Sequence, residues 1–188
     1  ENIEQKCKEI INTQTYDELV KKIANAKKIY LFGNGGLHYV ASHMATDMTR
    51  LIPDKVVFSY DSVGFITSSA NDYGFNELYV RWLETTSVVD NKDDCLVIGM
   101  SCSGNSVNVV KALHWANENN YETFLISGQK SEILENISEL TFNCEYFHTV
   151  EVLSMMIFYD MIHQTDNKCP SIRGEKNRLK DSDLRVLA

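Results

Sequence analysis

The chain has 188 residues, of which 44% are hydrophobic and 23% charged, and its formal net charge is −8 at pH 7. This size and composition are those of one globular domain with a sizeable core. The acidic balance argues against a partner that is nucleic acid or an anionic membrane. No apolar run approaches membrane-spanning length and no signal peptide is visible, so we expect a cytoplasmic protein.

Apolar periodicity predicts helices and strands that alternate along the chain. In chain order these are a helical segment (1–26), a strand (28–32), a helix (37–51), a strand (55–60), a weak helix (63–69), a turn (71–74), a helix (76–85), a strand (95–100), a helix (107–119), a strand (123–127), a short helix (132–136), a strand (140–144) and a long helix (149–163). The alternation predicts an α/β fold, with a parallel sheet covered by helices on both faces. We expect N-terminal helices over 1–27, one domain over 28–165 and a polar tail over 166–188.

The segment MSCSGNS, residues 100–106, follows a predicted strand and opens a predicted helix. It places the hydroxyls of Ser101, Ser103 and Ser106 around Gly104. Backbone N–H groups at a helix N-terminus have no intrahelical partner, and the helix dipole favours negative charge there. We therefore expect a cradle for the phosphate group of a small molecule. The plainer alternative is that Ser106 only caps the helix and that the other serines are ordinary turn residues.

A second loop, Gly33-Asn34-Gly35-Gly36, ends the first predicted strand in the same way. In an open α/β sheet, ligands bind beyond the carboxyl ends of the strands, where the strand order reverses. A flavodoxin-like order 2-1-3-4-5 sets the first and third strands side by side, so that their loops face each other across this crevice. A nucleotide is disfavoured, because no Walker lysine follows the glycines and no acidic ribose clamp stands at a convincing distance. The two facing loops predict a site in which the loop backbone lies against a bound sugar phosphate.

The five cysteines (Cys7, Cys95, Cys102, Cys144 and Cys169) are widely spaced and form no CxxC pair. They are typical of reduced packing thiols. Cys102 stands in the serine loop, where a helix N-terminus would lower the pKa of a thiol and make it reactive. The alternative, which we prefer, is that this loop position only needs a small side chain.

Three segments together resemble the sugar isomerase (SIS) domain family, and within it the phosphoheptose isomerases: LFGNGG…HMATDM, ANDYGFNELYVRWLE and IGMSCSGNSVNVVKAL. The likeness runs roughly over residues 28–163. It implies a five-stranded flavodoxin-like fold, a homodimer or homotetramer with active sites between subunits, and interconversion of sedoheptulose 7-phosphate with heptose 7-phosphate. Phosphate would be held by the three serines, with Asn34 and Asp72 near the sugar. The predicted substrate-binding set is Asn34, Gly35, Gly36, Asp72, Ser101, Cys102, Ser103, Asn105 and Ser106.

The chain departs from the family pattern at several functional positions. Leu37 stands where the family's first loop has a serine, and His43 with Asp47 stands where the family has a histidine followed by a glutamate. On the last helix, Val150 and Phe158 replace a glutamine and a histidine. A zinc site of the family type would lose half its ligands, so we expect no metal and no other cofactor.

Aldose–ketose isomerisation needs a base beside a carbonyl carbon and donors for the enediolate oxygens. Glu151 is one candidate base, because it is a lone charge at the start of an apolar helix and the segment EVLSMMIFYDMI resembles the glutamate-led last helix of the hexulose-phosphate isomerases. The alternative is an acid that merely suits a helix N-terminus.

Asp47 with His43 is the second candidate, since residues spaced i, i+4 share one helix face and can relay a proton. The alternative is a plain hydrogen bond between the two. His38 can protonate a ring oxygen or lie free in a loop, and His148 can replace the family's lost histidine. The tail residues Arg173 and Arg178 either form a solvated arm or reach a phosphate of another subunit.

Two functions fit these residues. The first is a phosphosugar isomerase that uses Glu151 or Asp47 as its base. The second is a SIS protein without catalysis that binds a sugar phosphate or a protein partner, as the changes at Leu37, Val150 and Phe158 would allow. We favour the enzyme.

Overall fold

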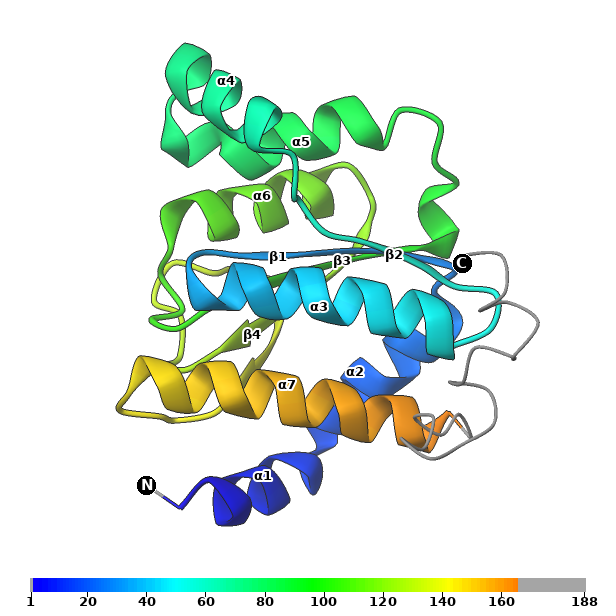
Figure 1. Cartoon of the computed structure of the whole chain (residues 1–188), viewed down its shortest axis with the longest axis vertical. Coiled ribbons are helices and arrows are strands. Elements are labelled where there is room, and N and C mark those ends of the chain that lie inside the picture. The colour runs from blue at the N-terminus through cyan, green and yellow to red at the C-terminus, as the bar shows by residue number, and fades with distance from the viewer. Residues whose placement is uncertain (1, 166–188) are drawn as a thin grey trace, which may run out of the picture.

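The computed structural model describes residues 2–165, which fold into a five-stranded sheet between two layers of helices (Figure 1). The elements, in chain order, are α1 (Ile3–Ile11), α2 (Gln14–Asn25), β1 (Lys28–Gly33), α3 (Gly36–Leu51), β2 (Val56–Phe58), α4 (Val63–Tyr73), the 3-10 turn η1 (Phe75–Glu77), α5 (Leu78–Thr86), η2 (Lys92–Asp94), β3 (Cys95–Ser101), α6 (Val107–Glu118), β4 (Glu122–Ser127), β5 (Ser138–Thr141) and α7 (Phe147–Gln164). The predicted polar tail, with Arg173 and Arg178, lies outside the described residues.

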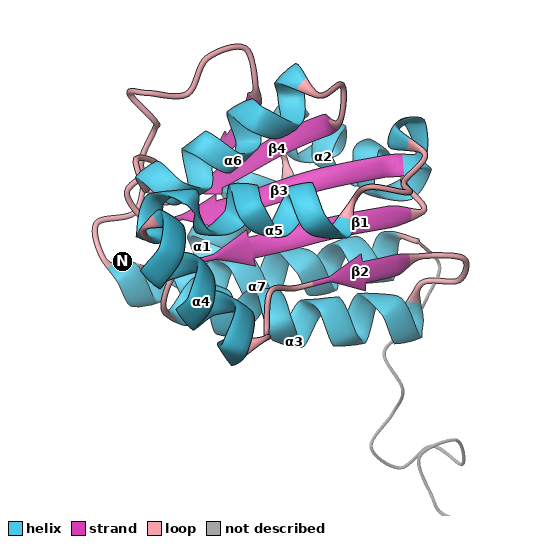
Figure 2. Cartoon of the chain, turned by 90° about the horizontal axis from the view of Figure 1, so that it is seen from above, coloured by secondary structure: helices cyan, strands magenta, loops and turns pink. Residues whose placement is uncertain are grey.

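The sheet has the order β2-β1-β3-β4-β5, and every neighbouring pair is parallel. All strand arrows therefore point the same way (Figure 2). This confirms the predicted α/β fold and the predicted strand order, in which the chain moves outward from β1 in both directions. The reversal of order falls between β1 and β3.

Helices cover both faces of the sheet, with α1, α2, α3 and α7 on one side and α4, α5 and α6 on the other (Figure 1). Alternate residues of β1 enter the two cores. Ile29 and Leu31 pack with the first group of helices, whereas Tyr30 and Phe32 pack with the second. Since side chains alternate across a strand and both faces are covered, the strand is apolar throughout.

The structure corrects the expected turn at residues 71–74. Helix α4 continues through Tyr73 and ends at Gly74, which has φ 87°. A positive φ suits glycine at a helix C-terminus. The expected helical segment at the N-terminus is two helices, because the Thr13 side chain accepts a hydrogen bond from Tyr16 N and starts α2 afresh.

The predicted short helix over 132–136 is wrong. Side-chain oxygens satisfy the backbone N–H groups of this segment: Asn105 Oδ1 accepts from Glu132 N (2.9 Å), and Ser131 Oγ accepts from Leu134 N (3.1 Å). Such side-chain acceptors compete with helical hydrogen bonds. The last strand is also shifted, since β5 spans Ser138–Thr141 rather than the expected 140–144. Asn143 adopts φ 54°, a left-handed conformation that does not continue a strand.

Among the described residues 2–165, no helix is long and apolar enough to cross a membrane.

Gly99 gives a stability test of this packing. It lies in β3 under α6, and a Cβ there would come 2.7 Å from Val109 Cγ1 and 3.0 Å from Leu113 Cδ1. Gly99→Ala is expected to destabilise the fold by about 1–3 kcal/mol through overpacking, measured by urea unfolding. The matched control is Gly64→Ala in α4, where a Cβ meets nothing within 4 Å. The control should be neutral or stabilising by about 0.5–1 kcal/mol, and an equal loss in both variants would contradict the packing argument.

Candidate functional site

One cavity of about 410 Å³ lies where β1 and β3 end. Its lining comes from the loop after β1, the loop after β3 and the start of α7: Asn34, Gly35, Gly36, Leu37, Met100, Ser101, Cys102, Ser103, Ser106, Phe147 and Glu151. The glycine loop and the serine loop, which lie far apart in the sequence, thus face the same space. They meet because Gly33 pairs with Met100 in the β1–β3 ladder.

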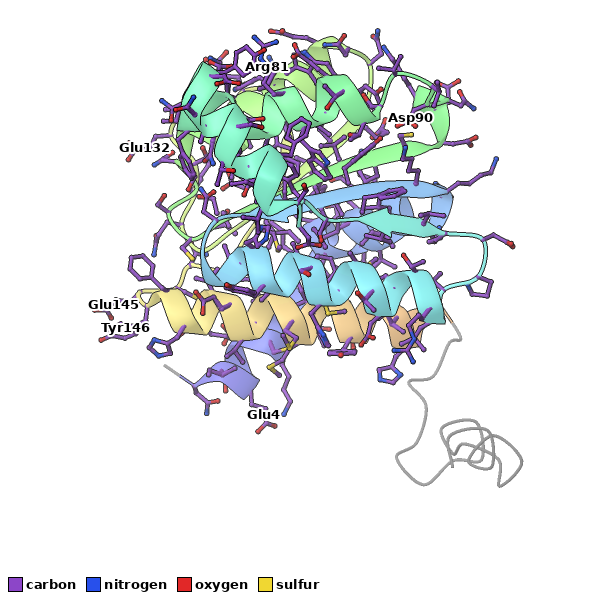
Figure 3. The ribbon with its side chains drawn as sticks, turned by 45° about the horizontal axis from the view of Figure 1, so that its top comes forward. Glu4, Arg81, Asp90, Glu132, Glu145 and Tyr146 are labelled. Carbon is purple, nitrogen blue, oxygen red and sulfur yellow. The ribbon has the colours of Figure 1, made fainter. Side chains whose placement is uncertain are left out.

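Three helices start at this cavity, namely α3, α6 and α7. The residues before them are Gly35, Ser106 and Tyr146, and none of the three makes a side-chain capping hydrogen bond. Figure 3 locates the start of α7: Tyr146, the residue before it, lies at the same end of the molecule as Glu132 and away from Asp90. Because uncapped helix N-termini carry free N–H groups and a positive partial charge, their convergence favours an anion.

The serine loop holds its hydroxyls in a fixed arrangement. Ser101 Oγ donates to Ser106 Oγ over 2.9 Å and accepts from Ser106 N over 3.3 Å. Gly104 has φ 74°, and a Cβ there would overlap the backbone of Gln129, so only glycine fits this turn. The Ser106 hydroxyl makes no capping hydrogen bond to the backbone of α6. Ser106 is therefore not merely a helix cap.

Gly36 of the glycine loop lies directly against the Glu151 carboxylate, which is possible because glycine has no side chain. A Cβ on Gly36 would overlap the Glu151 carboxylate. Glu151 lines the cavity and also a second, mostly apolar groove that continues between α3 and α7 past Val40 and Met155 to Tyr159. The Glu151 carboxylate therefore stands at the start of α3, between the cavity and the groove.

Asp47 and His43, the second pair of predicted catalysts, do not line the cavity. His43 Nε2 lies 2.8 Å from the Tyr159 hydroxyl, which donates to Asp47 Oδ2 over 2.7 Å. Arg50 lies 3.6 Å from the same carboxylate. This cluster is two helical turns along α7 from Glu151, about 12 Å at the usual helical rise.

Two predicted substrate-binding residues also lie away from the cavity lining. Asp72 is exposed on α4, and the Asn105 side chain turns toward Ser131 and Glu132. His38 pairs with Asp61 at 3.4 Å. The other members of the predicted set, in the two loops, line the cavity.

Two of the positions at which the resemblance implies zinc ligands, Val150 and Phe158, are part of the core. Val150 is 2% exposed and Phe158 is fully buried, and both pack in the cluster that holds Leu37. Over residues 2–165, no three His, Cys, Asp or Glu side chains gather to hold a metal ion. The residues present therefore do not fit a zinc ion of the family type.

Cys102 is not the activated thiol that a helix N-terminus would suggest. Burial, followed by the charge of Glu151 and the neighbouring Cys144, raises the pKa of the Cys102 thiol to about 11. Desolvation and a nearby negative charge both disfavour the thiolate. This agrees with the preferred interpretation of Cys102 as a small side chain in the loop.

Three residues in or beside the cavity were not predicted from the sequence. Asn108 and Tyr79 hold the Asn34 side chain by hydrogen bonds, and Phe147 lines the cavity mouth while 74% exposed. Of the three, only Asn108 could have been noticed in the sequence. It is a polar residue one helical turn before Ala112, on the face of α6 that is otherwise apolar and buried. Nothing local in the sequence links Tyr79 to the site.

Comparison with known proteins agrees with this geometry. The family model described as "SIS domain" matches residues 1–128. The phosphoheptose isomerase of Helicobacter pylori (strain P12) is 32% identical over 156 residues, which cover 80% of this chain and 78% of that protein. The chain belongs to the SIS domain family.

Two solved structures share the SIS fold. The phosphoheptose isomerase of Neisseria gonorrhoeae superposes with a TM-score of 0.70 at 21% identity, covering 87% of this chain and 91% of that one. A protein of Methanococcus jannaschii, for which a 3-hexulose-6-phosphate isomerase function was inferred, gives a TM-score of 0.62 at 19% identity, covering 98% and 92%. The relatives from Helicobacter pylori and Neisseria gonorrhoeae are named phosphoheptose isomerases.

The raised pKa of Cys102 can be measured by alkylation. A pKa of about 11 leaves about one thiol in a thousand as thiolate at pH 8. Iodoacetamide labelling of Cys102, followed by peptide mass spectrometry, should rise about tenfold per pH unit up to about pH 10. Glu151→Gln should label faster, because it removes one of the charges that raise the pKa. Labelling that is already maximal at pH 8 would contradict the assignment, and Cys102→Ser identifies the labelled peptide.

Proposed function

We propose that this SIS-domain protein is an aldose–ketose isomerase that acts on a sugar phosphate, with sedoheptulose 7-phosphate as the first substrate to test. The observation that carries the proposal is that one cavity joins the serine loop to the carboxylate of Glu151. An anion cradle and a base in the same cavity are the two parts that isomerisation of a phosphorylated sugar requires. The names of the relatives support the substrate class.

In this proposal the phosphate binds to the serine loop and to the uncapped starts of α3 and α6. Glu151 removes the proton from the carbon beside the carbonyl, which leaves an enediolate. The hydroxyl proton then moves from one enediolate oxygen to the other, and the same carboxyl group returns the carbon-derived proton to the neighbouring carbon. Electrons only move within the sugar, so the reaction balances with no external oxidant or reductant, and we propose that it needs no metal and no other cofactor.

Glu151 is the preferred base for a geometric reason. It lines the cavity with Ser101 and Ser106, whereas the carboxylate of Asp47 accepts a hydrogen bond from Tyr159 about two turns away. A general base must lie within hydrogen-bond reach of the proton that it abstracts. Within residues 2–165, Glu151 is the only carboxylate that lines the cavity with the serine loop.

The second candidate function is a SIS protein that binds a sugar phosphate without converting it, or that docks another protein. The specific observation in its favour is that Leu37, Val150 and Phe158 turn three polar positions of the family into core. Binding without turnover would be seen as thermal stabilisation by sugar phosphates in the absence of any product.

The isomerase proposal is tested by exchange of solvent deuterium into the carbon-bound position of sedoheptulose 7-phosphate, followed by NMR. Glu151→Gln is expected to slow exchange about 10²- to 10⁴-fold, the usual contribution of a general base. Asp47→Asn is the matched control, a carboxylate changed to an amide outside the cavity, and should retain exchange within about tenfold.

Inorganic phosphate should still raise the melting temperature of both variants, because the serine loop is untouched. Absence of exchange by the unaltered protein with any ketose or aldose phosphate would overturn the isomerase proposal. Equal loss in the two variants would move the base from Glu151 to the cluster that contains Asp47.

We also propose that the chain forms a homodimer or homotetramer, as the resemblance implies. The groove between α3 and α7 is lined mostly by apolar side chains, and Val152 and Met156 in it are 43% and 36% exposed. Light scattering after gel filtration should give a multiple of the single-chain mass. Met156→Glu should lower that mass, because it puts a charge into a buried interface. A single-chain mass for the unaltered protein would exclude the oligomer.

A further inference from the structure

The side chain of Asn34 is held by a reciprocal amide pair. Asn34 Nδ2 donates to Asn108 Oδ1 over 2.9 Å, and Asn108 Nδ2 donates to Asn34 Oδ1, also over 2.9 Å. The Tyr79 hydroxyl lies 3.2 Å from the same Asn34 oxygen and donates to the carbonyl of Gly33 as well. Asn108 and Tyr79 are each 2% exposed, whereas Asn34 is half-buried and lines the cavity.

A contact of Asn108 with the backbone determines which way the two amide groups are turned. Asn108 Oδ1 also accepts from the backbone N–H of Val109, over 3.0 Å. Exchanging the oxygen and nitrogen of Asn108 would set two donors against each other, so its oxygen must face Val109. The nitrogen of Asn34 must then face Asn108 Oδ1, because only a donor suits that oxygen.

Counting donors and acceptors shows what Asn34 has left for a ligand. A primary amide has two N–H donors and two acceptor positions on its oxygen. Asn108 occupies one acceptor position of Asn34 and one of its two donors, and the Tyr79 hydroxyl, which donates to Gly33, lies beside the Asn34 oxygen. The remaining donor is a single N–H on a side chain that lines the cavity. Asn34 therefore keeps one N–H that it can donate to a ligand.

We propose that Asn34 donates this N–H to the substrate carbonyl oxygen, which becomes the enediolate oxygen, and that Asn108 and Tyr79 are the positioning residues that aim it. The inference rests on the proposed function, since it concerns the same reaction. Glu151 removes the proton from carbon, the electron pair moves onto the carbonyl oxygen, and Asn34 stabilises the charge that forms there. A donor fixed in advance in a partly buried site stabilises such charge without reorganising.

The competing explanation is structural. The same hydrogen bonds tie the loop after β1 to the start of α6, and a tie of this kind would matter to stability alone. The two explanations differ in one measurable respect. A positioning role acts through Asn34 and disappears when Asn34 is absent, whereas a structural tie between Asn108 and its surroundings affects turnover independently of the Asn34 amide.

The experiment is a double-mutant cycle on kcat and KM for sedoheptulose 7-phosphate. Asn34→Ala is expected to lower kcat about 100-fold with a much smaller change in KM, because the donor acts on charge that develops in the transition state. Asn108→Ala should lower kcat about tenfold. The double variant should be no slower than Asn34→Ala alone. Effects that multiply in the double variant would overturn the proposal.

Two further variants keep the test sharp if Asn108→Ala does not fold. Tyr79→Phe removes only the hydroxyl that donates to Gly33 and lies beside the Asn34 oxygen. It should lower kcat in the presence of Asn34 but not in the Asn34→Ala background. Asn34→Asp has the same shape but no N–H, so it should lose at least as much kcat as Asn34→Ala. An active Asn34→Asp variant would overturn the donor role.

Asn117→Ala, an exposed position on the same α6, is the matched control and should leave kcat unchanged. Circular dichroism and melting temperature report whether each variant is folded. Lack of exchange by the unaltered protein would overturn the proposed function and this inference together. If the unaltered protein turns over normally but the effects of Asn34→Ala and Asn108→Ala on kcat multiply in the double variant, only this inference is overturned.

Discussion

The hydrogen-bonded ladder between β1 and β3 is the constraint on which the site depends. Its last pair sets Gly33 beside Met100, so the chain leaves both strands at the same edge of the sheet. Parallel strands put their carboxyl ends together, and the reversal of strand order opens a crevice between the segments that follow. With β1 and β3 apart in the sheet, the glycine loop and the serine loop would have no common ligand.

Backbone and hydroxyl groups, rather than cationic side chains, make the site suitable for an anion. No lysine or arginine belongs to the cavity lining within the described part of the chain, and the protein as a whole is acidic. The positive partial charge comes from three uncapped helix starts, and the small residues Gly36 and Gly104 allow the backbone and Glu151 to come close. Anion binding of this kind depends on the fold more than on the net charge.

The departures from the family pattern have a consistent physical consequence. Leu37, Val150 and Phe158 are all buried, and they join one hydrophobic cluster with α1, α2, α3 and α7. Apolar side chains at these positions gain packing and remove groups that could bind a metal or move a proton. Under the proposed function, the chemistry then rests on the Glu151 carboxylate and on the Asn34 amide held by Asn108 and Tyr79.

The α/β class and the two loops could be predicted from the sequence, because apolar periodicity and clusters such as GNGG and SCSGNS are local signals. The strand order was what the resemblance to the SIS family implied. Local signals misled at 132–136, where the oxygens of Asn105 and Ser131 replace helical acceptors. The folded chain shows that Glu151 is the carboxylate beside the serine loop, and it brings Asn34, Tyr79 and Asn108 together. These are contacts between distant parts of the chain, set by how the helices pack on the sheet, and no short-range pattern records them.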